Sequence, residues 1–339
     1  MAVVRNNVLT DAASRQSFIS GVNLLKNEDT TLVTSQFGIP GQPNPVMTYD
    51  LFVIWQITAM NTPVPPGGNA NNRNSAHRGP VFLPWHRIML IWFEMQLQRV
   101  LGDPFFGLPY WDWALDGTPP FPGAPPNPTA SALWNNSADK MGGEGTPIPG
   151  GGFFFDSNDP TSFRVRISTT LNGALQQQIP PRGLRRQFGG PSPFGSPTLP
   201  TVVDVLGAFN TLFEPSLGTY DFSPFDFSSA GFRNRLEGFV GPGLHNQVHR
   251  WMGGDMGPAS SPNDPVFFLH HCNVDRIWEA WMRINGRNYL PDGSADPSAY
   301  LGHRIDDPLA APFSDGVTPD TPRKVLDVSN IYSYDSLPA

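Results

Sequence analysis

The sequence contains a single cysteine, Cys272, in 339 residues. One thiol cannot form a disulfide within the chain, so the stability of the fold has to come from packing and does not depend on an oxidising compartment. A long apolar run is also missing, because the most hydrophobic segment, Ile88 to Phe93, is short and is followed by Glu94. We therefore expect neither a disulfide scaffold nor a membrane-spanning protein.

Charge of one sign is not concentrated anywhere along the chain. The 22 Lys and Arg residues and the 29 Asp and Glu residues give a formal net charge of -7, and neither sign forms a long run. We therefore expect a small-molecule partner and no nucleic acid. The first residues show neither a cationic leader with an apolar core nor a twin-arginine signal, which predicts a cytoplasmic protein or one exported only together with a partner.

Proline and glycine are plentiful, at 38 and 34 residues, but they gather in three stretches around residues 63–68, 119–152 and 180–200. Between these loops, proline-poor apolar stretches predict helices. No repeat and no persuasive system of alternating strands is present. The expected helices run from a cap at Thr10 to about Leu25, from Tyr49 to Met60, from Leu83 to Leu101, from Gly241 to Met252, and from Asn263 through Trp281.

Six of the seven histidines fall in two short regions. His245 and His249 are four residues apart, so on a helix their imidazoles project from one face and can chelate a metal. His271, on another predicted helix, can supply a third nitrogen and leave a coordination position open. In the other region, His77 lies in a loop and His86 lies early in a helix.

Each of these histidines also has an ordinary structural interpretation. A single pair four apart on a helix is more often structural than metal-binding, His86 could be a core histidine with its hydrogen bonds satisfied, and His77 could be an exposed loop residue. The sequence around the histidines favours the metal.

Residues 77–87, His-Arg-Gly-Pro-Val-Phe-Leu-Pro-Trp-His-Arg, resemble the first copper signature of the tyrosinase family. Residues 264–275 fit the second signature, which ends in His-x-x-x-Asp, and its register selects His271 over His270 as the ligand. His245 and His249 stand where the family has the first two ligands of its second copper. The resemblance covers essentially the whole chain and extends through Pro109–Trp113, Arg233–Glu237 and Tyr332–Tyr334, with Arg5 where the family has an arginine near these tyrosines.

The resemblance implies a mainly α fold, in which a central four-helix bundle holds a dinuclear metal site among long Pro/Gly-rich loops with little β structure. It implies one copper domain over residues 1–339 without a C-terminal lid domain. The implied cofactors are two copper ions, and the implied reaction uses O2 to oxidise phenols, o-diphenols or o-aminophenols to quinone-type products. Bacterial relatives often need a small caddie protein that delivers copper, so such a partner is expected.

One position departs from the family pattern. The first copper should have a third histidine, in a helix resembling Tyr-Asp-x-Phe-Val-x-x-His, but residues 49–56 end in Gln56. Helical spacing places Gln56 on one face with Phe52 and Met60, so its side chain should point inward. An amide oxygen is a weaker and harder donor than imidazole, so we expect the first copper to bind less tightly.

Similarity to bacterial tyrosinases assigns Glu237 and Asn246 to hold a water that removes the phenolic proton, and Arg250 to orient the substrate. Asp275, one helical turn after His271, is a candidate for orienting that imidazole or for a plain salt bridge. Ordinary roles are expected for a buried Cys272, for His303 in a loop, and for a solvated surface cluster of Arg182, Arg185 and Arg186.

Three function classes follow: a copper oxidase, a reversible O2 binder, and a redox-silent mononuclear metalloprotein on the same scaffold. The loop of residues 253–262 contains no aromatic side chain that could cover the copper, which favours the oxidase over the O2 binder. Gln56 adds weight to the mononuclear alternative, with one metal at His245, His249 and His271.

Overall fold

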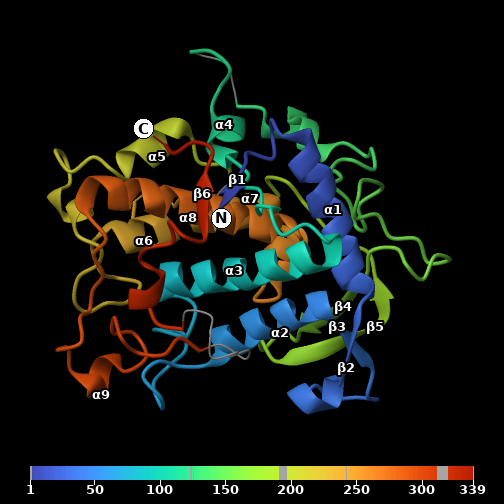
Figure 1. Ribbon diagram of the computed structural model, residues 1–339, viewed down its shortest axis with the longest axis horizontal. Helices are drawn as coiled ribbons and strands as arrows, with labels where there is room; N and C mark the ends of the chain where they lie inside the picture. Colours follow the sequence, from blue (N-terminus) through green and yellow to red (C-terminus); the bar gives the residue numbers. More distant parts are fainter. Residues whose placement is uncertain are drawn as a thin grey trace.

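The computed structural model describes residues 2–122, 124, 126–190, 197–241, 243–310 and 320–338. Its centre is helical and is built from segments far apart in the sequence (Figure 1). α3 lies against α8, α7 lies against the same helix, and α1 covers α2 and α3 on one side. These helices are α1 (Ala12–Asn27), α2 (Thr48–Asn61), α3 (Phe82–Leu101), α7 (His245–Met252) and α8 (Val266–Asn285).

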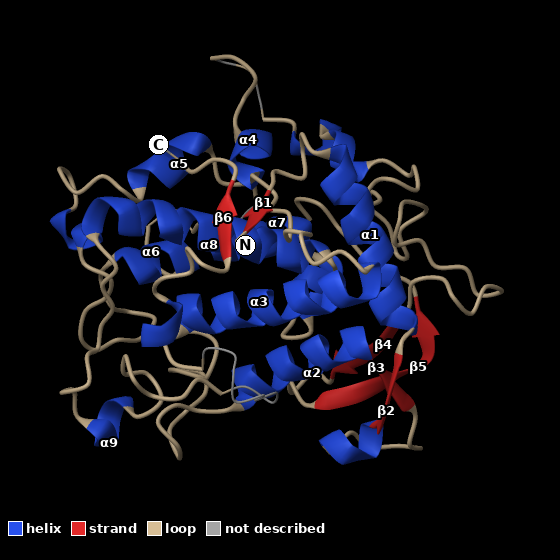
Figure 2. Cartoon of the chain, in the orientation of Figure 1, coloured by secondary structure: helices blue, strands red, loops and turns tan. Residues whose placement is uncertain are grey.

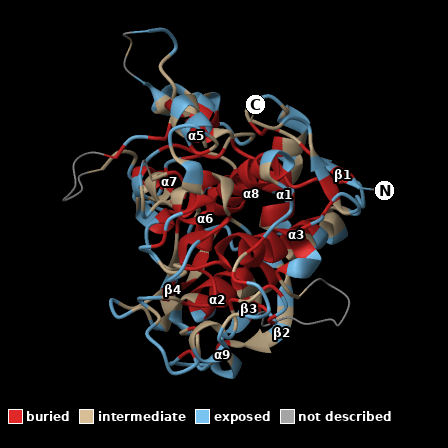
Figure 3. Ribbon diagram, turned by 90° about the vertical axis from the view of Figure 1, so that its left-hand side faces the viewer, coloured by how far each residue is buried: buried red, intermediate tan, exposed pale blue. Residues whose placement is uncertain are grey.

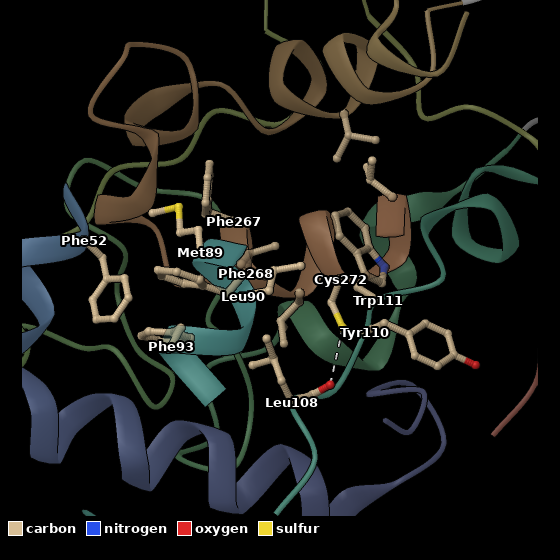
Figure 4. Packing of buried hydrophobic residues seen from close by; sticks show 14 of the residues in the cluster. Phe52, Met89, Leu90, Phe93, Leu108, Tyr110, Trp111, Phe267, Phe268 and Cys272 are labelled. Carbon is tan, nitrogen blue, oxygen red and sulfur yellow. Dashed lines mark hydrogen bonds between the residues drawn. The ribbon is translucent and has the colours of Figure 1, made fainter. Parts of the chain in front are cut away.

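Aromatic packing joins α2, α3 and α8 into one core. The rings of Phe93 and Phe268 stack with centroids 3.5 Å apart, and Phe52 meets the edge of Phe93 at 5.1 Å (Figure 4). Close by, the Cys272 thiol donates to the Leu108 carbonyl at 3.4 Å, and burial raises the pKa of this thiol to about 12. The expected role of Cys272 as a buried residue is confirmed.

The remaining elements lie around this core, and strands are few and peripheral (Figure 2). Within the described residues, the strands form three two-stranded sheets, whereas the sequence indicated no strand system. The short helices are α4 (Trp113–Gly117), α5 (Val202–Gly207), α6 (Phe232–Glu237) and α9 (Pro297–Tyr300). The strand pairs are β1 (Val3–Arg5) parallel to β6 (Tyr332–Tyr334), β2 (Asp29–Val33) antiparallel to β3 (Pro45–Met47), and β4 (Val165–Thr169) antiparallel to β5 (Leu175–Arg182).

The pairing of β1 with β6 fastens both ends of the described chain over α3 and α8. Arg5 is fully buried, donates to Glu94 at 2.9 Å, lies 3.5 Å from an Asp275 oxygen, and has its guanidinium 3.4 Å from the centre of the Tyr332 ring. The expected packing of Arg5 near the terminal tyrosines is confirmed.

Three helix starts differ from the sequence prediction. α8 begins at Val266, not at a cap on Asn263, whose Oδ1 has no partner among the described residues. α1 is capped by Asp11, whose carboxylate accepts the Ser14 N–H at 3.0 Å. The Thr10 N–H donates to the Asn7 carbonyl at 3.1 Å, in a turn that precedes the helix. α7 begins at His245, four residues later than predicted from Gly241, which has a left-handed φ of +65°. A left-handed residue cannot continue a right-handed helix.

The predicted solvated cluster of arginines is wrong for two of its three members. Arg186 is buried and makes a two-point ion pair with Asp264 at 2.7 and 2.8 Å, and Arg182 pairs with Asp255. Only Arg185 of the three is exposed. The partners lie 70 or more residues away in sequence, so no local pattern indicated these contacts.

Buried residues gather where the central helices meet (Figure 3). Among the helices in the described part of the chain, none combines the length and the apolar composition required to cross a membrane.

Candidate metal centre

The structure brings the five histidines predicted as ligands into one cluster. His77 lies in the loop before α3, His86 lies in α3, His245 and His249 lie on α7, and His271 lies on α8. The ring centroids of His86 and His271 are 4.1 Å apart, those of His77 and His86 4.8 Å, and those of His245 and His249 4.6 Å. His249 is partly exposed and the other four are buried.

Backbone carbonyls fix the orientation of three of these rings. The Nδ1 atom lies 2.7 Å from the Phe82 oxygen in His86, 3.1 Å from the Glu237 oxygen in His245, and 2.7 Å from the Met256 oxygen in His249. A carbonyl only accepts hydrogen bonds, so the proton of each neutral ring is on Nδ1 and the lone pair is on Nε2.

The Nε2 atoms of His245 and His249 face each other at 3.1 Å. Because each ring carries its proton on Nδ1, the two Nε2 atoms face each other with their lone pairs and with no hydrogen between them. This contact is repulsive unless a cation lies against both nitrogens. Two nitrogens bound to one metal at about 2.0–2.1 Å with a tetrahedral angle would be separated by about 3.3 Å. The observed spacing is therefore that of a chelating pair.

Other imidazole nitrogens in the cluster also lack partners among the described residues. These are Nδ1 of His77, Nε2 of His86, and both nitrogens of His271. A buried polar atom without a partner costs about 1–3 kcal/mol, so several in one place indicate a missing ligand. Burial lowers the pKa of all five rings, to about 3 for His86 and about 4 for His249, so they are neutral at pH 7 and fit a metal ion.

Gln56 is buried, as its position on the predicted helix required. Its Nε2 donates to the Met60 sulfur at 3.5 Å, and its Oε1 is buried without a partner in the described structure. An unpartnered amide oxygen can accept a hydrogen bond or coordinate a metal.

The two residues assigned to the phenolic proton lie next to the same histidine. The Asn246 Oδ1 and the Glu237 carbonyl oxygen are each 3.1 Å from the Nδ1 of His245. The Glu237 carboxylate is buried and accepts the Arg78 N–H at 2.6 Å and an Arg233 N–H at 2.9 Å. Burial raises the pKa of Glu237 although Arg233 opposes the shift. Arg250, in the last turn of α7, is exposed.

Asp275 does not contact the imidazole of His271, so its predicted orienting role is wrong. Its carboxylate accepts from Arg87 at 2.5 Å and from the hydroxyls of Tyr332 and Tyr334 at 2.6 and 2.5 Å. Burial alone would raise its pKa, but the guanidinium groups of Arg87 and Arg5 hold that pKa below its ordinary value. Asp275 thus joins α3, α8 and β6, as a salt bridge with partners outside its own helix.

Two further histidines are buried that the sequence left aside. His270 lies beside His245, His249 and His271, although the signature register selected only the last of these. His303 is in a loop, as predicted, but is fully buried against Gly79, where an added Cβ would lie 2.4 Å from the ring. The adjacent pair of histidines at 270 and 271 was the available signal for His270.

Comparisons with known proteins agree with this geometry. The family model described as the common central domain of tyrosinase matches residues 47–284. The chain is 36% identical to a tyrosinase of Streptomyces antibioticus over 275 residues, which are 79% of this chain and 84% of that protein. It is 33% identical to a tyrosinase of Streptomyces glaucescens over 341 residues, covering 99% of this chain and all of that protein.

Solved structures share the fold at low sequence identity. A mutant polyphenol oxidase from Thermothelomyces thermophila superimposes with a TM-score of 0.61 at 20% identity, over 99% of this chain and 89% of that one. A polyphenol oxidase of Vitis vinifera gives a TM-score of 0.57 at 19% identity, over 99% of this chain and 85% of that one.

The mostly helical domain and its clustered imidazoles agree with the family matches, which identify the class as type-3 copper proteins. Within that class, the chain belongs to the tyrosinase family of copper phenol oxidases, which use two copper ions. The expected mainly α fold and the copper cofactor are thereby confirmed.

Proposed function

We propose that the chain uses O2 to oxidise phenols, o-diphenols or o-aminophenols to quinone-type products. His245, His249 and His271 hold the second copper, and His77, His86 and Gln56 hold the first. The observation that carries this proposal is the 3.1 Å contact between the bare Nε2 atoms of His245 and His249. Family membership supports the phenolic substrate class.

The bound coppers supply the exchange of electrons between the phenolic ring and O2. The chain's own contribution is to hold each imidazole by its Nδ1–H, so that the Nε2 lone pairs point to fixed positions. Burial of the other four rings, with His249 partly exposed, limits access of bulk water and keeps the imidazoles neutral.

Removal of the phenolic proton is assigned to a water held by Glu237 and Asn246, and substrate orientation to Arg250. A phenol with a reference pKa near 10 is mostly protonated at pH 7, so hydroxylation of a monophenol needs this step. Both residues contact His245, which supports a position beside the second copper.

The experiment compares copper binding by the wild type and by Gln56→His. An additional imidazole at the first site should raise the affinity for the second equivalent of copper by about 10–100-fold, the range measured for changes around metal ligands. Copper per chain is measured after dialysis at fixed free copper, and the near-UV absorption of the copper-loaded protein is recorded after peroxide is added.

Gln16→His is the matched control, because Gln16 is exposed on α1 and should leave copper binding unchanged. If the wild type and Gln56→His load two coppers with equal affinity, Gln56 does not occupy a ligand position. If neither the wild type nor Gln56→His loads two coppers per chain, the proposed dinuclear site is wrong.

A further inference from the structure

His270 is the one member of the histidine cluster to which no role has been assigned. Its side chain is fully buried in α8, and neither ring nitrogen has a hydrogen-bond partner among the described residues. A neutral imidazole has one donor and one acceptor, and buried polar atoms in native proteins are nearly always paired. Two unpaired nitrogens on one buried ring therefore leave both atoms available to a bound group, and the neighbours of the ring decide whether a metal ion fits there.

The position of the ring indicates what it binds. His270 stacks on His245 with centroids 5.1 Å apart and planes 17° apart, and its centroid lies 5.0 Å from those of His249 and His271. One nitrogen from each of these four rings can be chosen so that all four lie within 4.8 Å of one another. Four neutral nitrogens this close form a possible donor set for a single metal ion.

We propose that His270 is a fourth ligand, which completes a four-imidazole site with His245, His249 and His271 when the chain holds one metal ion. The inference rests on the proposed second-copper set and adds one residue to it. The ions that suit four imidazoles in a tetrahedral arrangement are closed-shell ions such as Zn²⁺ and Cu⁺.

The composition of the two halves of the cluster favours this one-metal form. The proposed first-copper set has two imidazoles, of His77 and His86, and an amide, of Gln56, which is a weaker donor. The other half of the cluster offers four imidazoles. The first metal ion to arrive therefore goes to the four-imidazole set. A site closed by four protein ligands has no open position, so His270 has to leave the metal before O2 or a substrate can bind there.

The test uses Co²⁺ alone as the probe, because its visible absorption is several times stronger in a four-coordinate site than in a five- or six-coordinate one. Metal-free full-length protein is titrated with one equivalent of Co²⁺, and the affinity is measured by competition with a chelator. The variants are His270→Gln and His271→Gln. His303→Gln is the matched control, since His303 is equally buried, also lacks partners for both ring nitrogens, and lies outside the four-imidazole set.

We expect His270→Gln to lose the intense four-coordinate spectrum and to bind Co²⁺ at least about tenfold more weakly, while the control keeps both properties. Thermal unfolding of the metal-free proteins separates a metal role from a structural one. If the ring serves the metal, His270→Gln should leave the unfolding temperature of the metal-free protein unchanged or raise it. The substitution should then reduce only the increase in unfolding temperature that Co²⁺ causes.

The outcomes distinguish this inference from the proposed function. If His271→Gln loses Co²⁺ but His270→Gln keeps the wild-type affinity and spectrum, the second-copper set stands and the fourth ligand is wrong. If both variants bind Co²⁺ as the wild type does, the proposed set itself is wrong. If His270→Gln lowers the unfolding temperature of the metal-free protein as much as that of the Co²⁺-bound protein, the ring is structural and the inference is overturned.

Discussion

At the scale of single residues, Glu237 contacts its surroundings through both its carboxylate and its backbone carbonyl. Its carboxylate is fully buried, and both oxygens already accept hydrogen bonds, from the Arg78 amide and from Arg233. Its backbone oxygen holds the ring of His245. A charge kept inside the protein by a guanidinium, and next to a proposed copper ligand, is well placed to polarise a water.

Replacing Glu237 with glutamine should therefore separate the two kinds of substrate. Glu237→Gln keeps the shape and an acceptor for the Arg78 amide but removes the negative charge. We expect kcat on a monophenol to fall by about 100-fold, the lower end of the range for loss of acid-base assistance, while kcat on an o-diphenol changes little. Steady-state rates at matched copper content measure the ratio of kcat on the monophenol to kcat on the o-diphenol. Glu214→Gln is the control, because it removes a carboxylate that is partly exposed. An equal loss of kcat on both substrates would show that Glu237 supports the structure of the site and does not take part in removal of the phenolic proton.

Asp116, on α4, is a second residue with a shifted pKa. Burial raises its pKa from 3.8 to about 6, although the Trp111 N–H, at 2.8 Å, stabilises the carboxylate. Between these two values the unfolded chain has released the proton and the folded chain still holds it. The folded state binds more protons there, so the contribution of Asp116 to stability falls as the pH rises from about 4 to 6.

Asp116→Asn removes this titration while keeping an acceptor for Trp111. We expect the free energy of unfolding of the variant, relative to the wild type, to increase by about 1–3 kcal/mol between pH 4 and pH 6.5, given 1.36 kcal/mol per unit of pKa shift and partial solvent screening. Urea unfolding at several pH values measures the difference. A difference that stays constant with pH, or one that decreases, contradicts the raised pKa.

At the scale of elements, the long helices were predicted from sequence and the contacts between them were not. α2 and α3 match their predicted bounds to within one residue at each end, because apolar periodicity and flanking proline or glycine are local signals. α7 was predicted too long because the backbone conformation of Gly241 is not encoded by composition. The clustering of the five proposed ligand histidines could be predicted from their motifs, but the approach of His270 to α7 depends on how two helices pack.

The Arg186–Asp264 ion pair shows how much one contact between elements can contribute. Arg186 follows β5 and also donates to the carbonyls of Met141 and Gly142, while Asp264 accepts the N–H of Val266 at the start of α8. Both side chains are fully buried. The pair therefore holds the loop that contains Met141 and Gly142 against the start of α8, the helix that carries His271.

Arg186→Met leaves the Asp264 carboxylate buried without its counterion. We expect a loss of about 3–5 kcal/mol in the free energy of unfolding, measured by urea denaturation of the metal-free protein. The exposed pair between Arg323 and Asp306 offers the control, since Arg323→Met should leave the midpoint nearly unchanged. The double variant Arg186→Met with Asp264→Asn should lose less than the sum of the single changes. A single-variant loss as small as that of the control would mean that water or another group compensates the carboxylate.

At the scale of the whole molecule, the metal cluster and the hydrophobic core belong to one body. The cluster takes its imidazoles from α3, α7, α8 and the loop before α3, and the same helices carry the aromatic core. β1 and β6 bring both ends of the described chain to Asp275 on α8, four residues after His271. Binding at the cluster should therefore stabilise the whole chain together, as the proposed single domain over residues 1–339 requires.

Differential scanning calorimetry of the protein with and without copper tests this unity. Copper held at about 100 times its dissociation constant contributes about 2.7 kcal/mol, which for a chain of this length should raise the unfolding temperature by about 4 °C. We expect one transition that moves as a whole when copper is added and returns when a chelator removes it. His249→Gln should reduce the shift, because it removes one of the two nitrogens that face each other at 3.1 Å. A second transition that ignores copper would show that part of the chain folds independently of the cluster, and the single-domain interpretation would then be wrong.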